Sequence, residues 1–447
     1  MSFAEVAITF NAATSNNDTL SVAHVWDIRS GAAIASLKSC HASGVASSVL
    51  PVVNAGGRTC GILAVVSDRP TLHYWSWLKD QPHTRMTLPE KMGSLVITHS
   101  GLFCVGGGES GKLYVWEIST GRLLNVIDAH YRAIRIMKFS TDDHALITAG
   151  DDALCHSWSL STLFSKSKKP IPDITLTSHT LPITDMYLSM SLLQSARAYT
   201  ASIDRTVKTW QLYSKTLLFT ILFPTPIVCI AVDPPETRLF AGGDLGVIYG
   251  TELFPKQGDG SRRTMRNKGI EDGGALTYSS HTGKITGLAL SFDSTLLVST
   301  SMDKTAIVWD VISRQALRTF SDHKVPLTGL HVIIRPPDLL DPKSTLKSST
   351  VSTFRRHMTS DTDNQEVVAV PTHMDEEQSR KRKRSDFVDE LPLSLRLAHD
   401  ASGLDSTQSE VEQLRSEIAR LKQVNKQLKT VNDELYQAAV GQFSKQS

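Results

Sequence analysis

The stretch Gly106–Leu113 (GGGESGKL) has the spacing of glycine and lysine with which a phosphate-binding loop cradles a nucleotide. Such a loop needs a Ser or Thr hydroxyl for magnesium directly after the lysine, where this chain has Leu113. It also joins a strand to the N-terminus of a helix, whereas here a strand-like segment ending at Trp116 follows at once. The segment therefore predicts a turn between two strands and no nucleotide site.

Other arrangements that could carry catalysis are weak. The acidic pairs Asp142-Asp143 and Asp151-Asp152 lie in polar segments typical of hairpin turns, where Asp bonds the backbone. No HExxH or GxSxG motif occurs, and the five cysteines form no CxxC pair. We expect no catalytic residue, no cofactor and no metal, and we interpret the cysteines as reduced core thiols of an intracellular protein.

Bulk properties agree with a soluble intracellular chain. The formal net charge of +2 creates no overall field toward nucleic acid or membrane. The first residues, MSFAEVAITF, have no signal-peptide pattern, and no apolar run is long enough for a membrane span. We expect no membrane partner.

Three segments repeat one pattern of a His, a Ser or Thr, an Asp and a Trp. The Ser or Thr lies four residues before the Asp, and the Trp lies six residues after it. A buried Trp N–H needs an acceptor, and a hydroxyl can accept from it while donating onward. This arrangement resembles the hydrogen-bonded tetrad of WD-repeat blades, which is a structural device. The three sets are His130, Thr148, Asp152 and Trp158; His179, Thr200, Asp204 and Trp210; and His281, Ser299, Asp303 and Trp309.

Alternating apolar residues separated by polar turns continue through residues 1–337 and predict an all-β, seven-bladed WD-repeat β-propeller. Only three strands precede the second repeat, so we expect a strand at 326–334 to complete the first blade and remove the open edge. The blades are counted at Trp26, Trp75, Trp116, Trp158, Trp210, the Gly250 position, which lacks its Trp, and Trp309.

Two insertions interrupt the repeats. Residues 165–173 are expected to lengthen a connection between blades, and residues 255–278 to form a Gly-rich, basic loop. That loop is either a solvated surface excursion or a contact for RNA phosphates or an acidic partner. Its basic residues are Arg262, Arg263, Arg266 and Lys268.

The chain changes character after the propeller. Residues 338–402 are rich in Ser, Thr, Asp and Pro and predict a disordered linker. Its run of five basic residues is either a solvated segment or a nuclear import signal, the function we favour. That run is Arg380, Lys381, Arg382, Lys383 and Arg384.

Residues 403–447 predict a coiled-coil helix. Leu recurs every seven residues, with β-branched residues or Asn at the second seam position, and this combination favours a parallel homodimer. Pairing with a partner's helix or an isolated surface helix are the alternatives. The seam residues are Val411, Leu414, Ile418, Leu421, Asn425, Leu428, Asn432 and Leu435.

Nearly the whole chain resembles the family of WD-repeat-containing protein eighteen, also called the Ipi-three family of pre-rRNA-processing proteins. The most specific stretches are SHTLPITDMYLS (178–189), SIDRTVKTWQL (202–212) and AGGDLGVIYGTELF (241–254), with SLRL before the tail helix and VNDELY near its end. The resemblance implies a nuclear and nucleolar scaffold for assembly of the large ribosomal subunit. It implies a complex with two helical-repeat subunits that docks on pre-large-subunit particles, supports removal of the second internal transcribed spacer and recruits a midasin-type AAA ATPase. It also implies dimerisation through the tail helix and, for some members, a role in DNA replication licensing.

Two other functions remain open. The segment Val25–Arg29 ends in the WDxR pattern by which many propellers bind the adaptor of a cullin-type ubiquitin ligase, so the chain could be a substrate receptor. Trp-Asp is already dictated by the repeat, however, and a following Arg is common. A generic nuclear signalling scaffold is the third possibility.

Overall fold

A computed structural model describes residues 5–11, 22–38, 49–53, 59–66, 69–77, 79–164, 170–191, 196–253, 267–269, 276–336, 339 and 352–357. The chain divides into a unit of residues Met1–Ser360 and a unit of residues Asp361–Ser447, and every described residue belongs to the first. The basic run 380–384 and the segment 403–447, for which a coiled-coil helix is predicted, therefore lie outside the described residues. Within the described part, no helix has the length and apolar character needed to cross a membrane.

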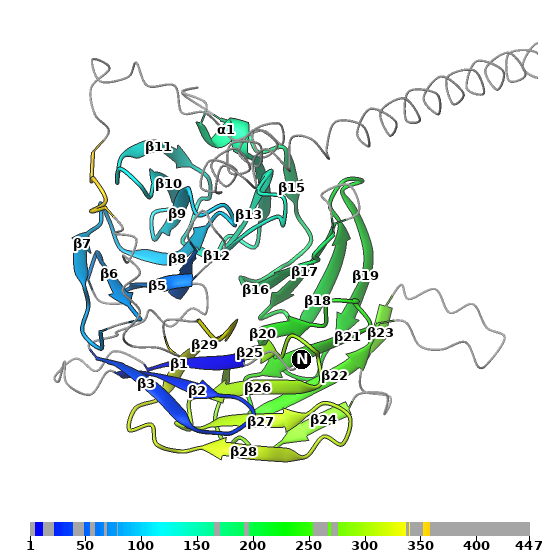
Figure 1. The fold of residues 1–447 in the computed structure, drawn as a ribbon. Coiled ribbons are helices and arrows are strands. Elements are labelled where there is room, and N and C mark those ends of the chain that lie inside the picture. Colours follow the sequence, from blue (N-terminus) through cyan, green and yellow to red (C-terminus); the bar gives the residue numbers. More distant parts are fainter. Residues whose placement is uncertain are drawn as a thin grey trace, which may run out of the picture. The chain divides into compact units, whose positions relative to one another are not determined.

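Seven sheets, each built on four antiparallel strands, are arranged around an axis, so the prediction of a seven-bladed β-propeller is confirmed (Figure 1). Blade 1 joins both ends of the propeller, because β29 pairs with β1 from Glu5↔Ile334 to Asn11↔Leu327. The strands of the first three blades, from the innermost outward, are β29 (Leu327–Ile334), β1 (Glu5–Asn11), β2 (Val22–Asp27) and β3 (Ala33–Lys38); β4 (Val49–Val53), β5 (Thr59–Val65), β6 (Thr71–Ser76) and β7 (Thr84–Thr87); and β8 (Met92–Ile97), β9 (Phe103–Gly108), β10 (Lys112–Glu117) and β11 (Leu123–Asp128).

The remaining four blades repeat the meander, and blade 5 gains a short fifth strand, β23, that runs parallel to β19. Their strands are β12 (Ile134–Phe139), β13 (Ala145–Gly150), β14 (Cys155–Ser159) and β15 (Ile174–Leu176); β16 (Ile183–Leu188), β17 (Arg197–Ser202), β18 (Thr206–Gln211), β19 (Thr216–Leu222) and β23 (Asn267–Gly269); β20 (Ile227–Val232), β21 (Arg238–Gly243), β22 (Val247–Glu252) and β24 (Leu276–Ser279); and β25 (Ile285–Leu290), β26 (Leu296–Ser301), β27 (Ala306–Asp310) and β28 (Ala316–Phe320).

The apolar core lies between neighbouring blades. Phe240 and Tyr278 of blade 6 pack in one cluster with Trp309 of blade 7, and Trp26 of blade 1 packs with Phe320 of blade 7. Alternation along each strand gives every blade two apolar faces, which only a neighbouring blade on each side can bury. The ring is therefore stabilised as a whole.

Two sequence expectations are corrected, for residues 165–173 and for residues 352–357. Residues 165–173 do not join two blades: together with α1 (Leu160–Phe164) they connect β14 to β15 of the same blade. The insertion 255–278 follows β22 of blade 6 along the chain. Within it β23 pairs with β19 of blade 5, and its last residues begin β24. Residues 352–357 were expected to be disordered linker, but Phe354 is buried against blade 3.

Candidate functional site

The first repeated His–Thr–Asp–Trp set forms a continuous hydrogen-bonded network in blade 4. Trp158 Nε1 donates to Thr148 Oγ1 at 3.2 Å, and that hydroxyl lies 2.8 Å from His130 Nε2. His130 Nδ1 lies 2.9 Å from the Asp152 carboxylate. Burial by itself raises the pKa of Asp152, but His130 and two backbone N–H donors lower it below its usual value. The network ties the loop entering the blade to the turn between β13 and β14.

Blades 5 and 7 repeat this geometry closely. Thr200 Oγ1 accepts from Trp210 at 3.1 Å and lies 2.8 Å from His179 Nε2. Burial opposes ionisation of Asp204, yet bonds from His179 and Thr206 hold its pKa well below its usual range. Each imidazole nitrogen and each hydroxyl is engaged in a bond that holds the fold, so the tetrads have no free nucleophile or base to offer to a substrate.

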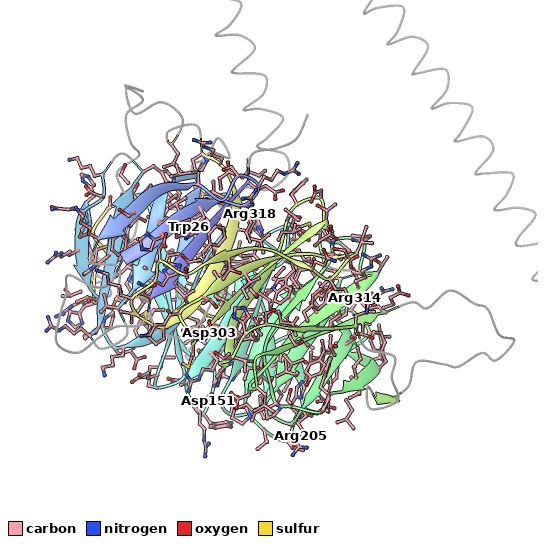
Figure 2. The ribbon with its side chains drawn as sticks, turned by 90° about the horizontal axis from the view of Figure 1, so that it is seen from below. Trp26, Asp151, Arg205, Asp303, Arg314 and Arg318 are labelled. Carbon is pink, nitrogen blue, oxygen red and sulfur yellow. The ribbon has the colours of Figure 1, made fainter. Side chains whose placement is uncertain are left out.

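The blade 7 set contains His281, Ser299, Asp303 and Trp309. Ser299 Oγ accepts from Trp309 at 2.8 Å, and His281 lies between Ser299 and Asp303 at 2.8 and 2.9 Å. Burial lowers the pKa of His281 although Asp303 opposes this. The turn at Asp303 lies with Asp151 and Arg205 toward one side of the propeller, whereas the turn at Arg314 lies toward the other (Figure 2).

Blade 1 contains a network that spacing within one repeat did not predict. Trp26 Nε1 donates to Thr9 Oγ1 at 3.1 Å, and Thr9 Oγ1 lies 3.3 Å from His323 Nε2. The His comes from the end of the propeller and the Thr from its start. The sequence signal for this network was the position of His323 just before the closing strand, which corresponds to the position of the tetrad His before the first strand of blades 4, 5 and 7.

Blades 2, 3 and 6 lack the Ser or Thr whose hydroxyl accepts the Trp hydrogen bond in the tetrads. In blades 2 and 3 another acceptor replaces it, and blade 6 lacks the Trp as well. Trp75 Nε1 donates to the carbonyl of Lys38 in blade 1 at 3.1 Å, and Trp116 Nε1 donates to the carbonyl of Arg355 at 3.0 Å. In blade 6, Gly250 stands at the Trp position, and the ring of Tyr278 packs beside it. The Trp at each of the six repeat positions that carry one thus has an acceptor, consistent with the cost of leaving a buried N–H unpaired.

One cluster has the residue types of a metal site. Ligand atoms of His130, Asp152 and His156 lie within 4.8 Å of one another. Both ring nitrogens of His130 already face Asp152 and Thr148, and His156 Nδ1 lies 3.0 Å from Thr175 Oγ1. Burial, together with His130, lowers the pKa of His156 to about 4. A metal would have to displace these bonds, so the cluster is better explained as part of the tetrad.

The hollow along the propeller axis contains two cavities of about 450 Å³ each, and both are lined by Ile136 and Asp185. Burial raises the pKa of Asp185 to about 6. Its carboxylate accepts backbone N–H bonds from Met186 and from Ile230 of blade 6, each at 2.8 Å. The group that could do acid–base chemistry there is thus engaged in joining two blades.

The remaining sequence-predicted residues are placed as follows. Gly106–Leu113 forms the β9–β10 hairpin, with Leu113 opposite Gly107, so the interpretation as a turn is confirmed. Arg262, Arg263 and Arg266 lie outside the described residues, and Lys268 is described only through the backbone pairing of β23.

Fold and tetrads together define a WD-repeat β-propeller protein. Residues 275–310 match the family model of the WD domain, G-beta repeat.

This chain is 33% identical to the pre-rRNA-processing protein IPI3 of Yarrowia lipolytica over 286 residues, which cover 62% of this chain and 66% of that protein. It is 33% identical to WD repeat-containing protein 18 of Mus musculus over 59% of this chain and 60% of that protein. It is 30% identical to the pre-rRNA-processing protein crb3/ipi3 of Schizosaccharomyces pombe over 63% of this chain and 69% of that protein. The chain belongs to the family of IPI3 and WD repeat-containing protein 18. It spans less than two thirds of the length of the first two relatives.

Proposed function

We propose that this chain is a non-catalytic scaffold subunit of a nuclear complex that assembles the large ribosomal subunit and supports pre-rRNA processing at the second internal transcribed spacer. The observation that carries the proposal is membership of a family whose relatives are named pre-rRNA-processing proteins. A ring of blades, in which the tetrad side chains are engaged in bonds inside the fold, suits a rigid binding platform better than an active site.

In this proposal the partners are two helical-repeat subunits, a midasin-type AAA ATPase and pre-large-subunit particles. The seam Val411–Leu435 joins two copies, so that two propellers bind one particle with higher avidity than either alone. The run Arg380–Arg384 directs import into the nucleus, and the insertion Arg262–Lys268 is the part of the propeller unit that would meet rRNA phosphates.

The test is to deplete the endogenous protein and restore it with a tagged copy. Precursor RNA containing the second internal spacer should accumulate on depletion and return to its normal level with the wild-type copy. Purification of the tagged copy from nuclear extract should recover that RNA together with two helical-repeat proteins. Normal processing after complete depletion would contradict the proposal.

The import signal is tested separately. A block change of residues 380–384 to Ala removes all five positive charges of the run at once. The tagged variant should then accumulate in the cytoplasm, as seen by microscopy, while the tagged wild-type chain is nuclear. A variant that stays in the nucleus would show that import depends on another segment or on a partner.

The ligase-receptor alternative gains no support from the structure. Arg29 donates to Asp293 of blade 7 at 2.8 Å, and its backbone N–H bonds Asp27. These contacts give Arg29 a structural role at the junction of the first and last blades.

A further inference from the structure

Blade 3 is completed by a segment that lies far away in the sequence. The position ten residues before Trp116, where the other tetrads have Thr or Ser, is Gly106. The acceptor for the Trp116 indole N–H is instead the carbonyl of Arg355, 3.0 Å away. We call Ser352–Arg355 the latch segment; it belongs to the gold stretch of the ribbon in Figure 1.

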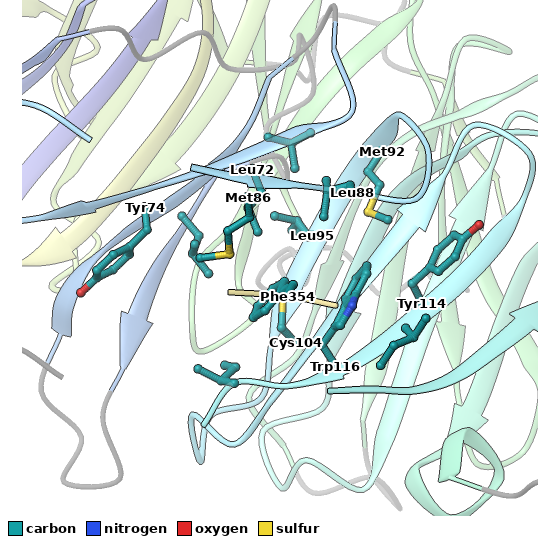
Figure 3. Close-up of a cluster of buried hydrophobic side chains, with 14 of the residues drawn as sticks. Leu72, Tyr74, Met86, Leu88, Met92, Leu95, Cys104, Tyr114, Trp116 and Phe354 are labelled. Atoms are coloured by element: carbon teal, nitrogen blue, oxygen red, sulfur yellow. The ribbon is translucent and has the colours of Figure 1, made fainter. Parts of the chain in front are cut away.

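Phe354 is the anchor of the latch segment. Its ring stacks on Trp116 with centroids 5.3 Å apart and an interplanar angle of 11°, and only 6% of the residue is exposed. Figure 3 shows the ring seated among the side chains of blades 2 and 3. Its neighbours in that cluster include Met86, Leu88, Leu95 and Cys104. Burying an aromatic side chain this fully stabilises the packing of the segment against blade 3. A linker whose side chains stay in water would gain no such stabilisation.

Main-chain bonds fix the segment in one register. Arg355 N–H donates to the carbonyl of Gly121 at 2.7 Å, and the Ser352 hydroxyl donates to the carbonyl of Ser119. The turn Glu117–Gly121 between β10 and β11 therefore supplies two acceptors, and Trp116 supplies one donor. Backbone hydrogen bonds combined with a pocket for a buried side chain are one established way in which a domain binds an extended peptide.

Gly121 gives independent support. It has a positive φ of 67°, but so do Lys215 and Arg314 near the ends of the corresponding turns of blades 5 and 7, at 57° and 63°. The turn thus accepts residues with a Cβ, and φ alone does not require glycine. A Cβ on Gly121 would lie 2.2 Å from the carbonyl oxygen of Thr353. The glycine makes room for the latch segment.

We propose that the outer part of blade 3 is a binding slot for an extended peptide with a buried aromatic residue, and that this chain's own Ser352–Arg355 is the ligand. The slot consists of Trp116, Ser119, Gly121 and the apolar residues beneath Phe354.

The first test supplies the ligand in trans. In the full chain, residues 352–355 are replaced by Gly-Ser-Gly-Ser, and a fluorescent peptide of residues 349–358 is titrated in while its anisotropy is followed. We expect saturable binding to this variant at least tenfold tighter than to the wild-type chain, whose slot is filled. The same peptide with Phe354→Ala is expected not to bind. Equal binding to both chains, or no binding to the variant at high peptide concentration, would overturn the proposal.

A second test uses the latch in place and does not depend on affinity in trans. Gly121→Ala should release the segment, so that trypsin cleaves after Arg355 at least tenfold faster than in the wild-type chain. The matched control is Gly31→Ala in the corresponding turn of blade 1, where φ is 78° and a Cβ would meet only the Arg318 side chain, at 3.1 Å. Cleavage at the wild-type rate in Gly121→Ala would contradict the latch, and circular dichroism would verify that both variants fold. Neither test depends on a role in ribosome assembly.

Discussion

The hydroxyl of Thr9 lies 3.3 Å from Nε2 of His323, although the two residues are 314 positions apart. Thr9 also accepts a hydrogen bond from the Trp26 indole N–H, so the first strands of the propeller and the segment before its last strand meet in one buried network. The ring of Phe320 stacks on Trp26 with the ring centroids 4.7 Å apart. Ring closure is therefore held by specific polar and aromatic contacts as well as by the pairing of β29 with β1.

This closure should be sensitive to acid. Burial and, to a smaller extent, repulsion from His24 lower the pKa of His323 to about 4, while Asp322 opposes the change. The pKa of an unfolded His is about 6.5. Between these values the unfolded chain binds more protons, so the free energy of unfolding falls as pH decreases from about 6.5 to about 4. A shift of this size corresponds to roughly 3 kcal/mol. His156, whose pKa is also about 4, adds to the loss in the same window.

Urea unfolding over a pH series measures the effect. His323→Gln should be less stable at neutral pH, because Thr9 loses its imidazole partner, and its stability should depend less on pH than that of the wild-type chain. His144→Gln is the control, since that side chain is 71% exposed in a turn. An unchanged pH slope in His323→Gln would show that this residue does not titrate with folding.

The contrast between blades 4 and 1 shows what the sequence could predict. Thr148, Asp152 and Trp158 lie within one pair of hairpins, so their contacts appear as fixed spacing. Thr9 and His323 are separated by nearly the whole propeller. Their contact therefore does not appear as a fixed spacing within one repeat.

The acceptors of Trp75 and Trp116 are main-chain carbonyls, which every residue carries, so no residue type marks them. Short outer strands were missed for a related reason. β15 has three residues and β24 has four, too few for alternation to be recognised. Residues 165–173, which precede β15, were therefore assigned to a connection between blades. Phe354 stands alone in a polar stretch without periodicity.

Removing the shared hydroxyl of a tetrad should lower the free energy of unfolding by more than the loss of one small group would suggest. Thr200→Val keeps the shape of the side chain but leaves the Trp210 indole N–H and the His179 Nε2 without their partner. An unpaired buried polar group costs about 1–3 kcal/mol, so we expect a loss of about 2–5 kcal/mol in the free energy of unfolding. Thr200→Ser keeps the bonds, as Ser299 does in blade 7, and loses about 1 kcal/mol for the methyl group. If Ser proved more destabilising than Val in urea unfolding, the hydrogen bonds would not be what matters here.

The proposed dimer depends on an apolar seam. Leu421→Asp or Leu428→Asp would place a carboxylate against its copy in the seam, where it is both desolvated and repelled. Each change should halve the mass measured by light scattering while the propeller still unfolds at its normal urea concentration. Gln423→Asp, at an outward heptad position, should remain dimeric. A dimer that survives both Leu changes would require another interface.

Arg29→Ala separates the two functional classes. The ion pair with Asp293 joins side chains that are 45% and 41% exposed, and pairs of this kind contribute about 0–1 kcal/mol. We therefore expect a small loss of stability, normal processing of spacer-containing precursor RNA in the rescue assay, and the same partners in the pull-down. Asp293→Ala breaks the same ion pair from the other side and is the matched control for the structural effect. One result would favour the ligase-receptor function: Arg29→Ala, but not Asp293→Ala, removes a cullin-ligase adaptor from the purified complex while RNA processing stays normal. Arg29 would then have a binding role beyond its ion pair.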